Sequence, residues 1–298
     1  MSAVTRFKSP KDAERFFAAY DAALALWPIA HESLKVATRY GMTHVNIAGS
    51  ADLPPLFLLH GAQICSTVWY ANVGALSRHF RIHAPDVVDQ MGRSLPTQKL
   101  KTPQDCSNWL CDLMDGLGVE RSSIAGNSQG GWLAINLAVN APQRVEKLIL
   151  LSPSGSIGRV HWQTFVHLLP VLLRPTKAMF YWNFQWLTTM PLGEVHPLAE
   201  QFMIGALSFK PQELSFGTVS VFSDDQLRGL TMPTLLLIGE QDGTCRPQAE
   251  LNRARRLIPN LQAELVAGGG HLFPVDQADT TNARLLAFLN ESTVHQKT

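Results

Sequence analysis

The sequence has few charged residues and few cysteines for its length. Lys, Arg, Asp and Glu make up 16% of the 298 residues, and 25 basic against 24 acidic residues give a formal net charge of +1. Because no run of basic residues occurs, we expect no nucleic-acid partner. The four cysteines form no CxxC pair and no Cys/His cluster with ligand spacing, so we expect no metal. No motif calls for a cofactor, since GSIG at 155–158 lacks the third glycine of a dinucleotide fingerprint.

Long apolar runs are also missing. The first 17 residues lack the apolar core of a signal peptide, and no stretch reaches the ~18 uncharged apolar residues that a membrane span needs. We therefore expect no membrane span and a cytoplasmic, reducing compartment for the four thiols. Hydrophobic residues reach 46%, which is enough to bury one large core. The sequence leaves open whether the protein forms a homodimer.

Short apolar runs alternate with helical patterns along most of the chain. Runs typical of buried strands occur at 54–61, 81–86, 122–126, 146–153, 233–242 and 261–268. Two further strands, at 34–40 and 43–48, flank a turn at Tyr40-Gly41 and should pair antiparallel at one edge. This alternation predicts an α/β fold with a mostly parallel, eight-stranded sheet and helices on both of its faces.

Residues 154–228 interrupt the alternation, because they contain no clear buried strand and many large apolar side chains. The strands on either side should belong to one sheet. We therefore predict a helical cap at 154–228, inserted into a core domain formed by residues 1–153 and 229–298. The cap should cover a site, with a substrate pocket lined by aromatic rings of Trp162, Phe165, Trp182 and Trp186. The alternative is that these rings only pack the cap onto the core.

The strongest chemical signal is the sequence Gly-Asn-Ser-Gln-Gly at 126–130, between a predicted strand and a predicted helix. A serine at such a turn has strained backbone geometry, and its hydroxyl projects beside a helix N-terminus that favours negative charge. We predict that Ser128 is a nucleophile. The backbone N–H groups of Gln129 and of Ala62, in the loop after the strand at 54–61, should form an oxyanion hole.

A serine hydroxyl needs a base, and the base needs a carboxylate. His271 follows the last predicted strand in a Gly-rich loop and is the predicted general base. His60 also ends a strand, but it fits a structural role better. Asp242 follows the strand at 233–242 and is the predicted acid that orients His271. Glu240, two residues earlier, is its rival.

Four motifs, LLHG at 58–61, GNSQGG at 126–131, IGEQD at 238–242 and GGGH at 268–271, occur in this order. With them the chain resembles the α/β-hydrolase superfamily over residues 30–292. The stretches at 43–61, 66–77 and 221–227 resemble bacterial carboxylesterases of the NP type. This resemblance implies hydrolysis of a small-molecule carboxylic ester through an acyl-enzyme intermediate on a Ser-His-Asp triad.

Two other functions stay open. Asn127, before the serine, is also associated with hydrolases that cleave a carbon–carbon bond in ring-cleavage products, and these use the same triad. A ligand-binding receptor or interaction protein on a hydrolase scaffold is the alternative of another class. A serine in place of an aspartate nucleophile argues against dehalogenase and epoxide hydrolase activity.

Overall fold

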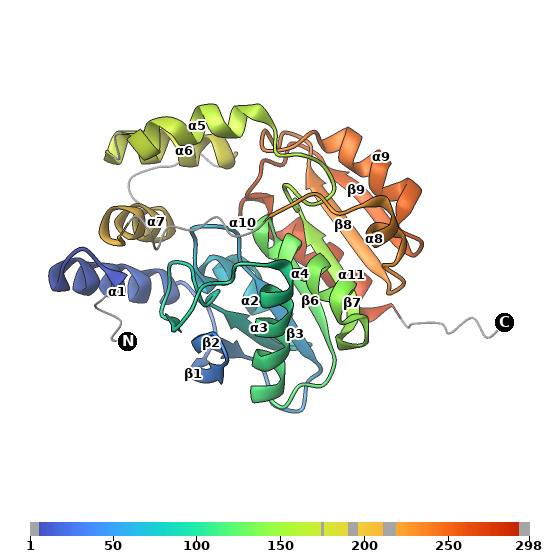
Figure 1. Cartoon of the computed structure of the whole chain (residues 1–298), viewed down its shortest axis with the longest axis horizontal. Coiled ribbons are helices and arrows are strands. Elements are labelled where there is room, and N and C mark those ends of the chain that lie inside the picture. The colour runs from blue at the N-terminus through green and yellow to red at the C-terminus, as the bar shows by residue number, and fades with distance from the viewer. Residues whose placement is uncertain (1–5, 174–175, 190–195, 211–218, 292–298) are drawn as a thin grey trace.

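A nine-stranded sheet forms the centre of the molecule. The computed structural model describes residues 6–173, 176–189, 196–210 and 219–291 (Figure 1). Eight strands follow one path in the order β1-β2-β4-β3-β6-β7-β8-β9. Their bounds are β1 (His31–Thr38), β2 (Gly41–Ala48), β3 (Pro55–Leu59), β4 (Arg81–Pro85), β6 (Ser122–Asn127), β7 (Val145–Leu151), β8 (Thr234–Gly239) and β9 (Leu261–Val266).

The direction of strand pairing confirms the predicted α/β class. The pairs β1–β2 and β2–β4 are antiparallel, and every other neighbouring pair on the path is parallel. The predicted number of eight strands needs one correction. A ninth strand, β5 (Leu95–Pro96), pairs with β2 off the main path. Two residues are too few to show any period in the sequence, so pattern analysis could not find this strand.

Helices cover both faces of the sheet. On one face lie α3 (Pro103–Gly116), α4 (Gln129–Asn140) and α9 (Pro247–Leu257). On the other lie α1 (Pro10–Leu24), α2 (Tyr70–Leu76) and α11 (Ala278–Asn290). The short helical segments are η2 (Ser66–Trp69), η3 (Pro142–Arg144) and α10 (Phe273–Asp276).

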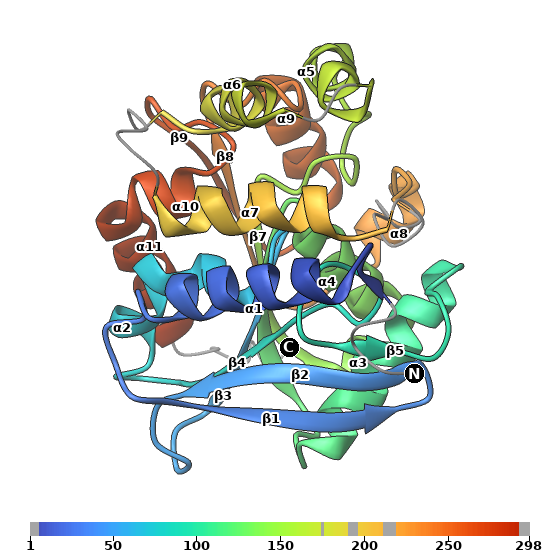
Figure 2. The same cartoon turned by 90° about the vertical axis from the view of Figure 1, so that its left-hand side faces the viewer.

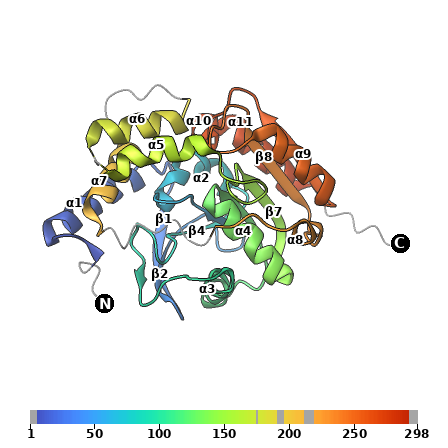
Figure 3. The ribbon, with the colours of Figure 1, turned by 45° about the horizontal axis from the view of Figure 1, so that its top comes forward.

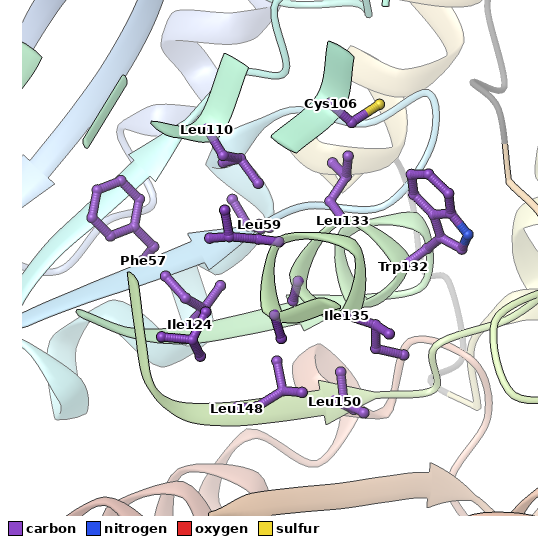
Figure 4. Packing of buried hydrophobic residues seen from close by; sticks show 14 of the residues in the cluster. Phe57, Leu59, Cys106, Leu110, Ile124, Trp132, Leu133, Ile135, Leu148 and Leu150 are labelled. Atoms are coloured by element: carbon purple, nitrogen blue, oxygen red, sulfur yellow. The ribbon is translucent and has the colours of Figure 1, made fainter. Parts of the chain in front are cut away.

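Burial on two faces explains the continuous apolar runs in the sequence. In β3, Phe57 and Leu59 belong to the hydrophobic cluster under α3 and α4, which Figure 4 shows. Leu56 and Leu58 belong to the cluster on the opposite face. Because successive side chains of a strand point to opposite faces, a strand that is covered on both faces has mainly apolar residues and no polar/apolar alternation.

Helices fill the described part of the chain between β7 and β8. They are α5 (Trp162–Leu173), α6 (Lys177–Leu187), α7 (Pro197–Ser208) and α8 (Asp224–Arg228). In Figure 2, α5 and α6 lie together at the top and α7 runs alongside α1, and direct contacts join both pairs. The helix α8 instead packs against α9 of the sheet layer. None of the described helices is both long and apolar enough to cross a membrane.

Candidate active site

Ser128 lies at the turn between β6 and α4, where it is the N-cap of α4. Its backbone has φ +54° and ψ −120°, and a positive φ is strained for any residue with a side chain. Two hydrogen bonds hold this conformation. The Ser128 N–H donates to the Leu151 carbonyl at 3.0 Å, and the Ser128 carbonyl accepts from the Trp132 N–H at 3.2 Å. The turn therefore fixes the hydroxyl-bearing residue directly before a helix N-terminus.

The glycines on either side of the serine are required by close backbone contact. A Cβ atom on Gly126 would lie 2.1 Å from the Gly130 carbonyl oxygen. A Cβ atom on Gly130 would lie 2.0 Å from the Leu59 carbonyl oxygen. Because no side chain fits at these distances, the strand and the helix can approach as they do only with glycine at both positions.

His271 and Asp242 form a buried pair. The His271 Nδ1 atom lies 2.9 Å from Asp242 Oδ2, and the Asp242 side chain has no solvent exposure. The loops that carry them meet closely, since a Cβ atom on Gly239 would lie 2.2 Å from the Gly270 carbonyl oxygen. Glu240, the rival acid, is exposed and accepts a hydrogen bond from the Gly268 N–H at 3.0 Å. The structure thus brings Asp242, and not Glu240, to the imidazole.

Thr244 completes this pair and was missed by the sequence analysis. Its N–H and its hydroxyl donate to Asp242 Oδ1 at 2.8 and 2.7 Å. Burial raises the pKa of Asp242, but the attraction of His271 and the hydrogen bonds from His271 and Thr244 outweigh it and lower the pKa to about 2. Asp242 is therefore an anion at neutral pH. A buried anion of this kind holds the Nδ1–H tautomer of its histidine partner.

The Thr244 hydroxyl also contacts two other side chains. It lies 3.1 Å from His271 Nδ1 and 2.5 Å from the Ser154 hydroxyl. Since its single proton goes to Asp242, the Ser154 hydroxyl is the donor in the second contact. No motif could have predicted this arrangement, because a threonine two residues after an aspartate is common.

The loop after β3 passes beside the serine. A Cβ atom on Gly61 would lie 3.2 Å from the Ser128 Cβ, so the next residue, Ala62, borders the same space. In the described ranges, no protein acceptor is within hydrogen-bond reach of the Ala62 N–H. Gln129 is the first residue of α4, and its side-chain oxygen accepts from Gln90 Nε2 at 2.6 Å.

His60 supports this loop. It is buried, and its Nε2 accepts from the Val87 N–H at 3.0 Å. Its Nδ1 must then carry the proton and donate to the Gly61 carbonyl at 2.8 Å. Burial lowers the pKa of His60, so the ring is neutral in this structural position.

A cavity of about 400 Å³ joins these groups. Ser128, His271, Ala62 and Gln129 all border it. The rest of its wall is mainly apolar and comes largely from the insertion, with Val160, Phe165, Leu168, Phe184, Trp186, Leu187 and Phe202. Three polar residues of the insertion also line it, Ser154, Thr164 and the buried Asn183, and no sequence motif pointed to any of them.

The prediction for the pocket rings needs a correction. Phe165 and Trp186 line the cavity, whereas Trp162 and Trp182 do not. Trp162 is 62% exposed and borders a second cavity. Trp182 is 45% exposed and stacks on His167 of α5, which also stacks on Trp186. The imidazole of His167 therefore occupies the side of Trp182 that faces α5.

A strained serine turn between a strand and a helix, a buried aspartate–histidine pair and an apolar cavity are the features of a serine hydrolase of the α/β type. Residues 56–284 match the model of the alpha/beta hydrolase family, and the chain belongs to this family. Among the described residues, no group of three His, Cys, Asp or Glu side chains could hold a metal ion.

Two relatives from Bacillus subtilis (strain 168) cover almost the whole chain. Carboxylesterase YbfK is 34% identical over 290 residues, which cover 95% of this chain and 96% of the relative. The uncharacterized carboxylesterase nap is 33% identical over 284 residues, which cover 94% and 93%. These relatives confirm the resemblance to bacterial carboxylesterases.

Solved structures agree with the sequence relatives. The crystal structure of carboxylesterase CesB (YbfK) from Bacillus subtilis matches with a TM-score of 0.87 and 32% identity, over 95% of this chain and 99% of that one. The crystal structure of naproxen esterase (carboxylesterase NP) from the same organism matches with a TM-score of 0.87 and 30% identity, over 95% and 100%.

Proposed function

We propose that the protein is a carboxylesterase that cleaves esters through an acyl-enzyme intermediate, with Ser128 as nucleophile, His271 as general base and Asp242 as orienting acid. The observation that carries this proposal is the buried pair of Asp242 and His271, 2.9 Å apart, whose His271 borders the same cavity as the strained Ser128. The carboxylesterase relatives, which align over nearly the whole chain, support the same reaction class.

In the first step, the Ser128 oxygen attacks the ester carbonyl carbon while His271 Nε2 takes the hydroxyl proton. The carbonyl oxygen becomes an oxyanion, which the N–H groups of Ala62 and Gln129 stabilise. The imidazolium formed on His271 lies against the Asp242 anion. When the intermediate collapses, the bond to the alcohol oxygen breaks and His271 gives its proton to the leaving alcohol.

In the second step, His271 takes a proton from water, whose oxygen attacks the acyl carbon of the Ser128 ester. Collapse returns the proton to the Ser128 oxygen and releases the carboxylic acid. The apolar cavity would take the acyl or alcohol group of a small-molecule ester and exclude bulk water from the acyl-enzyme.

The division of the chain forms part of the proposal. Residues 154–228 would be the cap and residues 1–153 and 229–298 the core, because α5, α6 and α7 supply most of the apolar cavity wall. The contact of α8 with α9 favours a cap boundary slightly before residue 224. A cytoplasmic location and a homodimer stay predictions from the sequence.

The experiment compares Asp242→Asn with Glu240→Gln on a panel of p-nitrophenyl esters and one ring-cleavage product. Loss of the buried anion should reduce kcat by about 10³-fold or more, because the wrong histidine tautomer is then favoured. Glu240→Gln should stay within about threefold of the wild type, since its carboxylate is exposed. Equal losses in both variants would reject the assignment. Turnover of the ring-cleavage product far above that of every ester would replace the esterase proposal.

A further inference from the structure

The outward side of α5 is apolar, which is unusual for a surface helix. Trp162, Phe165, Val166, Leu169 and Leu173 are 48–76% exposed and recur at a spacing of three or four residues, so they share one face. Trp182 of α6 adds a sixth exposed apolar side chain. These six side chains are here called the cap outer face. Figure 3 turns this side of the molecule forward and shows α5 and α6 next to each other.

The apolar side chains are concentrated there. Among the described residues, nine large hydrophobic side chains are exposed, and six of them form the cap outer face. The other three lie elsewhere: Leu34 on β1, Met42 on β2 and Val221 in the segment before α8. Single exposed apolar residues need no explanation, but a contiguous group of this kind marks a contact surface.

The charged residues of the sequence segment that carries this face are all basic. Positions 154–193 contain Arg159, Arg174 and Lys177 and no acidic residue. A second cavity, of about 460 Å³, lies next to Trp162 and is lined by Arg159 and Arg246, both exposed. Within the described ranges, neither arginine takes part in a salt bridge.

The acidic side chain of that cavity does not cancel these charges. Glu250 is buried, and burial together with the nearby Asp242 charge raises the pKa of Glu250 to about 8. It is therefore mainly neutral at pH 7. The third arginine of the cavity, Arg253, is paired with Asp224.

Two occupants could cover an apolar face with a basic rim. In a symmetric dimer the same patch of each copy meets that of the other, so the basic residues of the two copies would face each other. Positions 154–193 contain no acidic residue that could neutralise them. An anionic lipid surface matches both the basic rim and the apolar face, because its negative head groups lie over hydrocarbon chains. Exposed Trp and Phe beside Lys and Arg are the side chains that such interfaces favour.

We propose that the cap outer face, with the basic rim of Arg159, Lys177 and Arg246, docks the protein on an anionic lipid surface. The helix would lie in the plane of the interface with its apolar side chains among the acyl chains. Phe165 is 62% exposed and also lines the cavity that holds Ser128, so the docked face borders the cavity. This inference concerns binding and does not depend on the proposed ester hydrolysis.

The test is co-sedimentation of the full chain with phosphatidylglycerol vesicles and with phosphatidylcholine vesicles at 150 mM salt, ~0.15 M in ionic strength. The wild type should bind phosphatidylglycerol vesicles several-fold more tightly. Leu169→Ser with Leu173→Ser should weaken binding at least about tenfold, because each lost side chain leaves apolar area out of the lipid. Arg159→Gln with Arg246→Gln should weaken binding to the anionic vesicles about fivefold or more.

The matched control is Leu34→Ser, which removes another exposed leucine, from β1, and should leave vesicle binding unchanged. Unchanged thermal unfolding and hydrolysis of a water-soluble ester would show that the Leu169 and Leu173 double variant is folded. Absence of wild-type binding to both vesicle types would overturn the proposal, as would binding that the double variant retains. A wild-type dimer that the double variant converts to monomer would assign the face to a second copy instead.

Discussion

At the scale of single residues, two buried acids near each other have opposite ionisation. Asp242 receives two hydrogen bonds from Thr244 and contacts His271, so its pKa falls to about 2. Both oxygens of Glu250 are buried without a hydrogen-bond partner in the described structure, and its pKa rises to about 8. The difference follows from the attraction of His271 and from hydrogen-bond donors, which Asp242 has, whereas Glu250 lacks donors and lies near the Asp242 charge.

This difference predicts how stability depends on pH. Glu250 is protonated in the folded protein up to about pH 8, whereas in the unfolded chain it ionises near its ordinary pKa of 4.5. Between these values the folded state binds more protons, so its contribution to the free energy of unfolding falls as pH rises. Glu250→Gln removes this titration. Urea unfolding at pH 5 and pH 8 should show a loss of a few kcal/mol in the wild type that the variant lacks. Parallel pH dependence in both proteins would refute the ionisation state described for Glu250.

At the scale of elements, the turn from β6 to α4 depends on the absence of two Cβ atoms. Gly130→Ala would place a methyl group 2.0 Å from the Leu59 carbonyl oxygen, so β3 or α4 must move. We expect a loss of several kcal/mol in the free energy of unfolding, or no folded protein. Gly229→Ala is the control, because its Cβ atom would have 3.4 Å to the nearest atom and its φ is −72°. Thermal unfolding of both variants measures the difference, and equal stability would contradict the close approach.

The elements also show how far the sequence could be interpreted. Inner strands such as β3, β7 and β8 were predictable because burial on two faces makes their apolar runs continuous, whereas β1 and β2 were predictable from the turn between them. The helix α9 was not predicted: its segment Pro247–Leu257 is rich in charged residues and buries only a narrow stripe that includes Leu251, Ala254 and Leu257. The segment between β3 and β4 forms η2 followed by α2, a break that the apolar pattern does not indicate.

The candidate site likewise has a part that could be predicted from the sequence and a part that could not. Ser128, Asp242 and His271 each follow a strand with a distinctive local sequence, so their convergence at one sheet edge could be predicted. The cap could not be predicted in this detail, because rings that line a cavity and rings that face solvent have the same composition. Trp182 and Trp186 lie about one turn apart on α6. Of these two side chains, Trp186 borders the cavity and Trp182 does not.

This pair predicts a difference between two matched variants. Trp186→Ala enlarges the cavity and removes ring contacts with a bound ester, so KM for aryl esters should rise about tenfold. Trp182→Ala also removes an indole ring, but one that stacks on His167 and does not line the cavity. It should leave KM within about threefold of the wild-type value. Steady-state kinetics on aryl and short-chain acyl esters separate the two. A larger effect from Trp182→Ala would mean that the cavity described here does not hold the substrate.

At the scale of the whole molecule, the chain combines a rigid sheet edge with an inserted helical layer. The sheet edge supplies Ser128, Asp242 and His271 from three separated loops, and the insertion supplies most of the apolar wall. The same insertion turns an apolar, basic side to the outside. The cavity that holds Ser128 and the cap outer face thus both border the inserted helices, and Phe165 belongs to both.

The most direct measurement for this arrangement is mass-spectrometric mapping of the adduct left by a fluorophosphonate probe. We expect one phosphonyl group, on the peptide that contains Ser128, together with loss of ester turnover. Ser128→Ala should take up no probe and should lose turnover by about 10³-fold or more. A probe adduct on another serine, or undiminished ester turnover in Ser128→Ala, would contradict the account.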